Sequence, residues 1–527
     1  MSSSCPQCGA PTTSQNEPLN STVLTDTGTI ARCLKLMRTN EPPQVSEMAY
    51  IQAVLSKTGA QLADLDGKIM HLKAQLRQLE DERAVLAEYH AENTAVVSPV
   101  RRIPPEMLAE IFSWTLPFSD DFDECNSVRM KMEKSPWTLG QVSRRWRAIA
   151  LATPSLWSLV FISGKAAANS RPMIEAHIQC AHKLKIHFHG SSPKIELFQL
   201  LSEHATCWEE LDIQINATLA PRLAALRGQL LSLRKLWIRW DNPDSQHAVE
   251  SLKCFETATS LMAVRVDYGL RPLPVFFPTH QLTVYRMCCP WNSHREILNL
   301  SPNIVEARIA VTLNSPQPDG QVVNMGHLQR LSVYPSNVLE YLRAPATTRI
   351  TISSWEPSQQ NRVTSDLDTF VRHSSCVPRE LYLEGLPDAN TTAGILGKYP
   401  SITSIALVFT GGGHKKLTAA VDAHSTLLTH GNTLAFPQLQ KIYFASRSPL
   451  PFPINYAPFL NMLRSRWTAL HGAGFITKGA VTGPDPVTLK GLNALRENGL
   501  NLSLGWDTIE ARMLLDAWAY GTLWRTW

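Results

Sequence analysis

The sequence lacks the features that mark three broad classes of protein. Its apolar runs stay well short of the roughly 18 residues that a membrane-spanning helix needs, so we expect no such helix. The opening residues, MSSSCPQCGAP, have no basic region and no apolar core, so we expect no secretory signal. The charge imbalance is small, with 50 basic and 45 acidic residues, which argues against nucleic acid or an anionic membrane as the main partner.

Regularly spaced cysteine motifs are also scarce. The ten cysteines have irregular spacings, which is typical of reduced thiols and predicts a cytoplasmic location, a nuclear location or both. Cys5 and Cys8 form one Cys-x-x-Cys pair, but the second pair of a zinc knuckle is missing. The pair therefore leaves two interpretations, a solvated tail or a metal site, and we predict no metal.

Catalytic signatures are absent as well. The sequence has no phosphate-binding GxxxxGK[ST] loop, no HExxH and no GxSxG. His187 and His189 share one face of a predicted strand, but no third metal ligand is near them in sequence. The glycines at 411–413 are interpreted as a flexible turn, and Arg144, Arg145 and Arg147 as a solvated helix face. We predict a non-catalytic protein without a cofactor.

What is present falls into four zones. Residues 1–45 are rich in Ser, Thr, Pro and Asn and are predicted to be a flexible tail. Residues 46–95 carry a heptad pattern that predicts a coiled-coil helix, broken by Thr58 and Arg83. Its partner stays open: a second copy, another protein or the chain's own helices. We call its apolar positions the heptad stripe: Met48, Ile51, Leu55, Leu62, Leu65, Ile69, Leu72, Leu76, Leu79 and Leu86.

Residues 98–160 form a block dense in Pro, Trp and apolar side chains. Pro104 and Pro105 suit the first turn of a helix, where a missing N–H costs little. A second helix is predicted through Leu139 and Trp146, and residues 117–135 are predicted to be an inserted loop. The block is too small to bury all of its large apolar side chains, so part of its surface is expected to meet a partner.

The remainder, 165–527, contains short strand-like runs that start about 26 residues apart on average, within the range of leucine-rich repeats. Ten runs stand out, starting at Leu211, Leu236, Val264, Leu282, Ala307, Leu331, Ile350, Leu381, Ile405 and Ile442. This spacing favours an irregular repeat array, capped at its C-terminal end by residues 506–527. The alternative is a mixed α/β domain of unrelated strands.

The order of motifs in the block resembles the F-box. That family begins Leu-Pro-x-Glu-Ile-Leu and continues with Val-Cys-x-x-Trp and Pro-x-Leu-Trp. Here the chain reads Ile103-Pro-Pro-Glu-Met-Leu108, then Val142-Ser-Arg-Arg-Trp146, then Pro154-Ser-Leu-Trp157, with Ser143 at the usual Cys position. With the heptads before it, the chain is similar to the F-box proteins abundant in basidiomycete fungi.

The resemblance implies a substrate-recognition subunit of an SCF-type (Skp–cullin–F-box) ubiquitin ligase. It binds the Skp adaptor, and through it a cullin–RING scaffold, while the C-terminal region holds an unknown protein substrate. The alternatives are an F-box scaffold outside a ligase and an enzyme with a site in the C-terminal half. The implied adaptor-binding residues are Ile103, Pro104, Pro105, Glu106, Met107, Leu108, Ile111, Phe112, Leu139, Val142, Ser143, Trp146, Leu156 and Trp157.

The expected fold class is α plus α/β. It combines a long N-terminal helix or coiled coil, a three-helix F-box and a C-terminal irregular leucine-rich-repeat-like solenoid. The substrate-binding residues cannot be assigned from the sequence, because exposed strand residues look like any solvated surface.

Overall fold

The computed structural model describes most of the chain between residues 27 and 505. The described ranges are 27–39, 41–116, 136–162, 170–189, 195–240, 243–267, 274–312, 321–354, 357–385, 388–410, 413–429, 436–446, 455–477 and 484–505. Contacts divide the chain into two units, Met1–Pro104 and Pro105–Trp527. Cys5 and Cys8, the loop at 117–135, the glycines at 411 and 412 and the expected cap at 506–527 lie outside the described residues.

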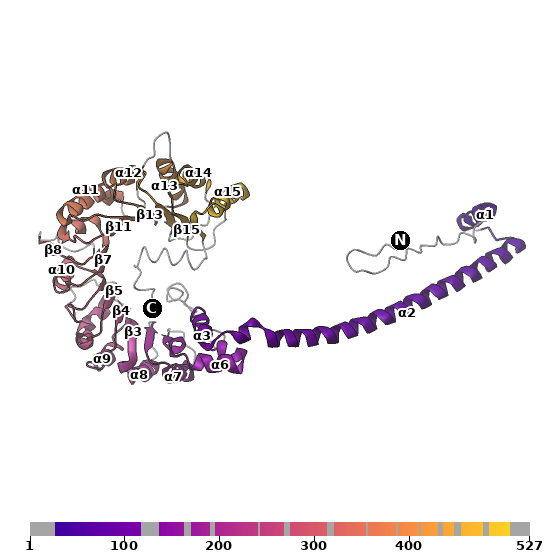
Figure 1. Cartoon of the computed structure of the whole chain (residues 1–527), viewed down its shortest axis with the longest axis horizontal. Helices are drawn as coiled ribbons and strands as arrows, with labels where there is room; N and C mark the ends of the chain where they lie inside the picture. The colour runs from indigo at the N-terminus through magenta and orange to yellow at the C-terminus, as the bar shows by residue number, and fades with distance from the viewer. Residues whose placement is uncertain are drawn as a thin grey trace. The chain divides into compact units, whose positions relative to one another are not determined.

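The first unit is helical, with α1 (Thr27–Arg38), the 53-residue helix α2 (Val45–Val97) and the 3-10 turn η1 (Pro99–Arg102). The prediction of a long helix over 46–95 is confirmed, and α2 is one continuous helix (Figure 1). It stops at Ser98, because the proline that follows pushes this residue into an extended conformation.

The expectation of a flexible tail is wrong for residues 27–38, which form α1. The composition of residues 1–45 did not predict this helix, because the side chains that stabilise it belong to another segment. Arg32 lies 3.0 Å from Glu47 and 3.4 Å from Glu41, so the start of α2 holds α1. Lys35 and Arg38 also suit the last turn of a helix, where positive charge is favoured.

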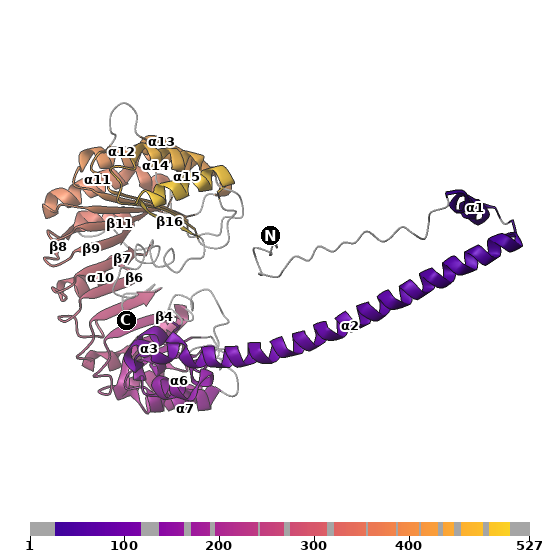
Figure 2. The ribbon, with the colours of Figure 1, turned by 45° about the vertical axis from the view of Figure 1, so that its right-hand side comes forward.

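The second unit is built on one parallel sheet of 14 strands. Figures 1 and 2 show the strands side by side, with helices along the outer side of the curved sheet. The strands, in spatial order, are β1 (Leu159–Ile162), β2 (Leu184–Phe188), β3 (Trp208–Ile215), β4 (Lys235–Trp240), β5 (Ala263–Asp267), β6 (Val284–Cys289), β7 (Glu306–Val311), β9 (Arg330–Tyr334), β11 (Arg349–Ser354), β12 (Glu380–Gly385), β13 (Ser404–Phe409), β14 (Lys441–Ser446), β15 (Gly472–Thr477) and β16 (Asn501–Gly505).

Helical segments connect most neighbouring strands, as parallel pairing requires. They are α7 (Ser170–Cys180), α8 (Ile195–Ser202), η3 (Ala205–Cys207), α9 (Ala220–Ala224), η4 (Pro243–Thr257), α10 (Trp291–Asn299), η5 (Ser336–Tyr341), α11 (Pro357–Ser374), α12 (Ala389–Lys398), α13 (Gly413–Leu428), α14 (Ala457–Arg466) and α15 (Pro486–Glu497). A small pair, β8 (Val323–Asn324) and β10 (Leu342–Arg343), lies apart from the main sheet.

The core lies between this sheet and its helices. Ile186, Leu211 and Leu236 are register partners on neighbouring strands, and the same row continues through Val264 to Leu381 and beyond. These side chains are buried in one continuous cluster. Since strand side chains alternate between faces, the next residue of each strand points to the opposite face, which carries the polar groups described below.

The expected fold class is wrong. The structure is of the α/β type, a 14-stranded parallel sheet with interspersed helices, and not a helical F-box joined to a leucine-rich-repeat solenoid. β1 begins two residues after the helical block ends at Trp157 and pairs with β2, so residues 105–157 of the block lie in the same unit as the sheet, whereas Ile103 and Pro104 belong to the first unit. Sequence spacing alone does not show which strands share hydrogen bonds, which is why the class was misjudged. Each of the ten predicted runs nevertheless overlaps a strand.

The helical block consists of α3 (Pro105–Ser113), α5 (Leu139–Val142), α6 (Arg144–Leu151) and the 3-10 turn η2 (Pro154–Trp157). The helix predicted through Leu139 and Trp146 is broken at Ser143. This residue is extended, and its side-chain oxygen accepts a hydrogen bond from the Trp146 N–H at 3.1 Å. Serine is a strong N-cap residue, so it ends α5 and begins α6.

Candidate functional site

The first candidate surface is an apolar face of α3. Met107 and Ile111 are 56% and 45% exposed, and Trp114, one residue beyond the helix, is 71% exposed. The spacing of four and three residues places these side chains on one side of the helix. Trp114 was not among the predicted residues, although its position seven after Met107 is a signal for the same face. Large exposed apolar side chains gathered on one face are typical of a protein interface.

The other predicted residues divide by burial. Pro104, Pro105, Glu106, Val142 and Ser143 are exposed, and Ile103 and Trp146 are half-buried. The remaining predicted residues are buried in the core: Leu108, Phe112, Leu139, Leu156 and Trp157. These five residues therefore hold the block together and do not form its surface.

Trp157 shows how the block is fixed to the sheet. Its indole N–H donates to the Ala150 carbonyl at 2.8 Å, and its own carbonyl lies 2.7 Å from Nδ1 of His177 on α7. Burial lowers the pKa of His177, and the contact with the Trp157 carbonyl only partly offsets this effect. These contacts join η2 to α6 and to α7.

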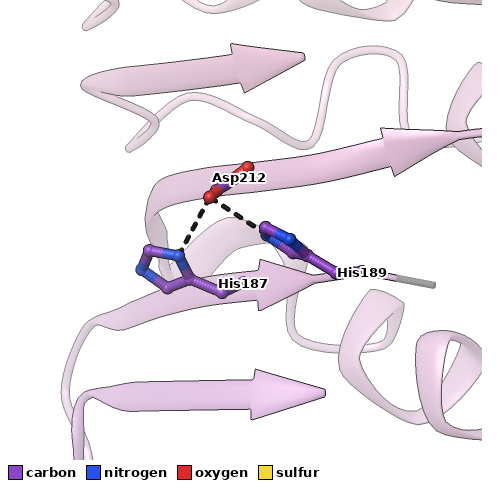
Figure 3. Close-up of side chains that lie close together, drawn as sticks. All are labelled: His187, His189 and Asp212. Carbon is purple, nitrogen blue, oxygen red and sulfur yellow. Dashed lines mark hydrogen bonds and ion pairs between the residues drawn. The ribbon is translucent and has the colours of Figure 1, made fainter. Parts of the chain in front are cut away.

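The second candidate is a cluster of His187, His189 and Asp212 (Figure 3). Nδ1 of His187 lies 3.1 Å from Oδ2 of Asp212, and Nε2 of His189 lies 3.0 Å from the same oxygen. His187 and Asp212 are register partners on β2 and β3. In the sequence no third ligand lies near the histidine pair, and for that reason a metal site was not predicted. That reason was wrong, because strand pairing brings the ligand from 25 residues away.

The three side chains offer the nitrogen and oxygen ligands that bind zinc, with ligand atoms within 4.8 Å of one another. A fourth group changes the charge balance. The guanidinium of Arg239 on β4 donates to Oδ2 of Asp212 at 3.1 Å, so the single carboxylate charge is already matched. Burial opposes ionisation of Asp212, but His189, His187 and Arg239 outweigh it and hold the pKa of this carboxyl well below its usual range. We assign the cluster as a paired polar network on the sheet.

The network continues along the same face. Trp237, the register partner of Asp212, has two guanidiniums against its ring, with Cζ of Arg239 3.8 Å and Cζ of Arg265 3.6 Å from the ring centroid. Its indole N–H donates to Asp267 at 2.9 Å. Farther along, Glu306 accepts from Arg286 at 2.6 Å and from Arg330 at 2.9 Å. We call this row the charged face, defined by Asp212, Trp237, Arg239, Arg265, Asp267, Arg286, Glu306 and Arg330.

A pocket lies where β3 to β6 begin. Glu209, Glu210, Arg234, Lys235, Met262, Ala263, Thr283 and Val284 line it. Burial lowers the pKa of Lys235 to about 8, although Glu210, 3.4 Å away, opposes this shift. The charged groups lie in pairs, and Met262, Ala263 and Val284 supply the apolar part of the lining.

Comparison with protein families and with curated proteins identifies no relative for this chain. No protein-family description matches it, and the search of curated proteins finds no significant match. Among the described helices, none combines the length and the apolar character that crossing a membrane requires.

Proposed function

We propose that this chain is the substrate-recognition subunit of an SCF-type ubiquitin ligase. The block at 98–160, whose motifs resemble the F-box, binds the Skp adaptor, and the sheet-bearing unit holds a client protein. Ubiquitin transfer is performed by the cullin–RING subunits. The chain acts by proximity, because tethering raises the effective concentration of the client near the conjugating enzyme.

The observation that carries the proposal is the exposed face of α3. Its outward residues Met107, Ile111 and Trp114 are apolar, while the inward residues Leu108 and Phe112 already fill the core. An amphipathic helix normally turns its apolar side chains inward and polar ones outward. A helix that is apolar on both sides has a second surface to bury, and a protein partner supplies it.

The client is proposed to lie on the charged face. Trp237, Arg239 and Arg265 are among its half-buried members, with both guanidiniums against the tryptophan ring, and tryptophan and arginine are the residues that most often dominate binding energy at interfaces. Alternating positive and negative side chains along neighbouring strands provide specificity, because a partner with mismatched charges is rejected.

Co-expression of the full chain with the Skp adaptor, followed by capture of the tagged chain, tests the proposal. We expect stoichiometric adaptor with the wild type and at least a tenfold loss with the Met107→Asp, Ile111→Asp double variant. Leu151→Asp is the matched control, because Leu151 is similarly exposed but lies on α6, outside the proposed face. Circular dichroism and thermal melting establish that each variant is folded.

Two outcomes contradict the proposal: a folded wild type that captures no adaptor, or a double variant that captures as much as the control. If adaptor binds, reconstitution with the cullin–RING subunits separates a ligase receptor from a scaffold. A receptor directs ubiquitin onto itself or onto co-captured proteins, and a scaffold binds the adaptor without transfer.

A further inference from the structure

The long helix α2 carries an apolar surface that the described part of the chain leaves uncovered. Nine of the ten residues of the heptad stripe are between 44% and 67% exposed, and Ile51 is half-buried. A helix of 53 residues extends about 80 Å, and its stripe runs along most of that length. A stripe with 3.5-residue spacing faces a single partner helix continuously, which is the geometry of a coiled coil.

We infer that two copies of the chain associate through α2 as an antiparallel coiled coil. The inference concerns α2 alone and does not depend on the proposed adaptor binding. It rests on the two polar positions that interrupt the stripe, Thr58 and Arg83, and on the charges beside it. In the parallel arrangement and in the other antiparallel registers, these same residues make unfavourable contacts.

A parallel pair places identical residues opposite one another. Arg83 occupies a core position, so the two copies of Arg83 meet inside the interface, where like charges repel. The positions that flank the core also bring like charges together in a parallel pair. Lys68 lies beside Lys73 of the second copy, since flanking residues five apart are neighbours in a parallel pair. Two repulsive contacts arise there by symmetry, and a third arises in the core.

An antiparallel pair with its axis between residues 70 and 71 removes these conflicts. Ile69 then lies opposite Leu72 of the second copy, Leu62 opposite Leu79 and Leu55 opposite Leu86. In the same register Arg83 falls opposite Thr58 of the second copy. Both polar breaks therefore share one layer at each end, where the short threonine leaves room for the arginine stem to reach water. Every layer between them is apolar.

The flanking charges agree with this register. Asp66 lies beside Lys73 of the second copy, and symmetry gives two such pairs. Sliding the second copy by one heptad in one direction sets Lys68 against Lys68 and Asp66 against Asp66. A shift in the other direction sets Lys73 against Lys73. Either shift also places Arg83 opposite an apolar residue, so one register satisfies both the core and its flanks.

Sedimentation equilibrium of the full chain tests the association. We expect twice the chain mass of 58.7 kDa at micromolar concentration, and a single-chain mass for the Ile69→Asp, Leu72→Asp double variant. Val85→Asp serves as the matched control, because Val85 is an exposed apolar residue of α2 that lies outside the stripe. A wild type that sediments as a single chain overturns the inference.

Charge variants and cross-linking test the direction. In the antiparallel pair, Lys73→Glu removes the pairing with Asp66, so we expect at least a fivefold weaker dimer. In a parallel pair the same substitution would relieve the clash with Lys68 and strengthen the dimer. A stronger dimer overturns the antiparallel arrangement. Under mild oxidation, a mixture of Thr58→Cys and Arg83→Cys chains is expected to form a disulfide-linked pair of the two different chains above the wild-type background. Cross-linking of Thr58→Cys chains with each other, at a comparable yield, also overturns it.

Discussion

Phe112 of α3 and Trp146 of α6 pack against each other, with ring centroids 4.8 Å apart and ring planes inclined at 51°. Phe112 is fully buried, and Trp146 is half-buried above it. Aromatic pairs in tilted arrangements of this kind add stability beyond their buried area. The contact fixes α3 to α6 from the inside and leaves the apolar face of α3 directed outward.

Truncation of the buried side of α3 should therefore affect folding more than truncation of the exposed side. We expect Phe112→Ala to lower the free energy of unfolding by about 3–5 kcal/mol, because it leaves a cavity beside Trp146. Ile111→Ala, on the exposed face, should change it by no more than about 0.5–1 kcal/mol. Urea unfolding of the two variants measures the difference, and equal losses would show that α3 has no distinct inner side.

Asp212 should stabilise the protein through its charge. Its pKa is held below the unfolded value near 3.9, so the stabilisation is present above that pH and is lost as the pH falls toward the folded-state pKa. Asp212→Asn leaves buried partners unpaired, and we expect a loss of about 3–5 kcal/mol at pH 7. The difference in free energy of unfolding between wild type and variant should not narrow until the pH falls below about 4.

Asp267→Asn is the control for this experiment. Asp267 pairs with Arg265 at 2.9 Å, but its side chain is 26% exposed, so water screens the pair. We expect a loss of about 1 kcal/mol or less. Chemical denaturation at a series of pH values compares the two variants. A difference in free energy of unfolding between wild type and Asp212→Asn that already narrows between pH 7 and pH 5 would contradict a stabilising charge on Asp212.

His294 should make the protein less stable in mild acid. Burial lowers the pKa of His294 to about 4, and its ring contacts the Tyr285 hydroxyl at 2.7 Å and the Ala310 carbonyl at 3.1 Å. Between about pH 6.5 and pH 4 the unfolded chain takes up a proton that the folded chain does not, so stability falls as the pH falls. One such group contributes about 1.4 kcal/mol per pH unit.

The His294→Gln variant isolates this contribution. We expect its stability to fall less steeply than that of the wild type over the same pH range, although its stability at pH 7 is lower. Thermal melting at pH 7, 6 and 5 provides the comparison. Parallel pH profiles for the two proteins would show that His294 is charged in the folded state.

Two glycines should respond to alanine with opposite signs. A Cβ on Gly474 in β15 would lie 2.9 Å from the Ser503 carbonyl oxygen and 2.9 Å from Cδ1 of Tyr443, so Gly474→Ala should cost about 1–3 kcal/mol. A Cβ on Gly397 in α12 meets no atom within 4 Å. Gly397→Ala should therefore stabilise the helix by about 0.5–1 kcal/mol. Melting temperatures that move in the same direction would contradict this packing.

The sequence predicted local structure well where the signal lies within one element. The heptad spacing identified α2, and alternation of apolar residues located ten of the 14 strands of the main sheet, because each pattern reflects a single helix or strand meeting one apolar surface. Gly499, with a φ of 96°, lies just after α15, where a glycine commonly ends a helix. The break at Ser143 was missed, since an amphipathic pattern continues across it and only the capping hydrogen bond ends α5.

By itself, the sequence predicted the long helix α2 and ten of the 14 strands of the main sheet, and it showed which residues are apolar. The tertiary structure alone decided that 14 strands join one parallel sheet, that Leu108 faces the core while Met107 faces outward, and that Asp212 meets His187. The physical reason is the range of the interactions. Backbone preference and side-chain periodicity act over a few residues, whereas strand register and burial depend on segments tens of residues apart that meet only in the folded chain.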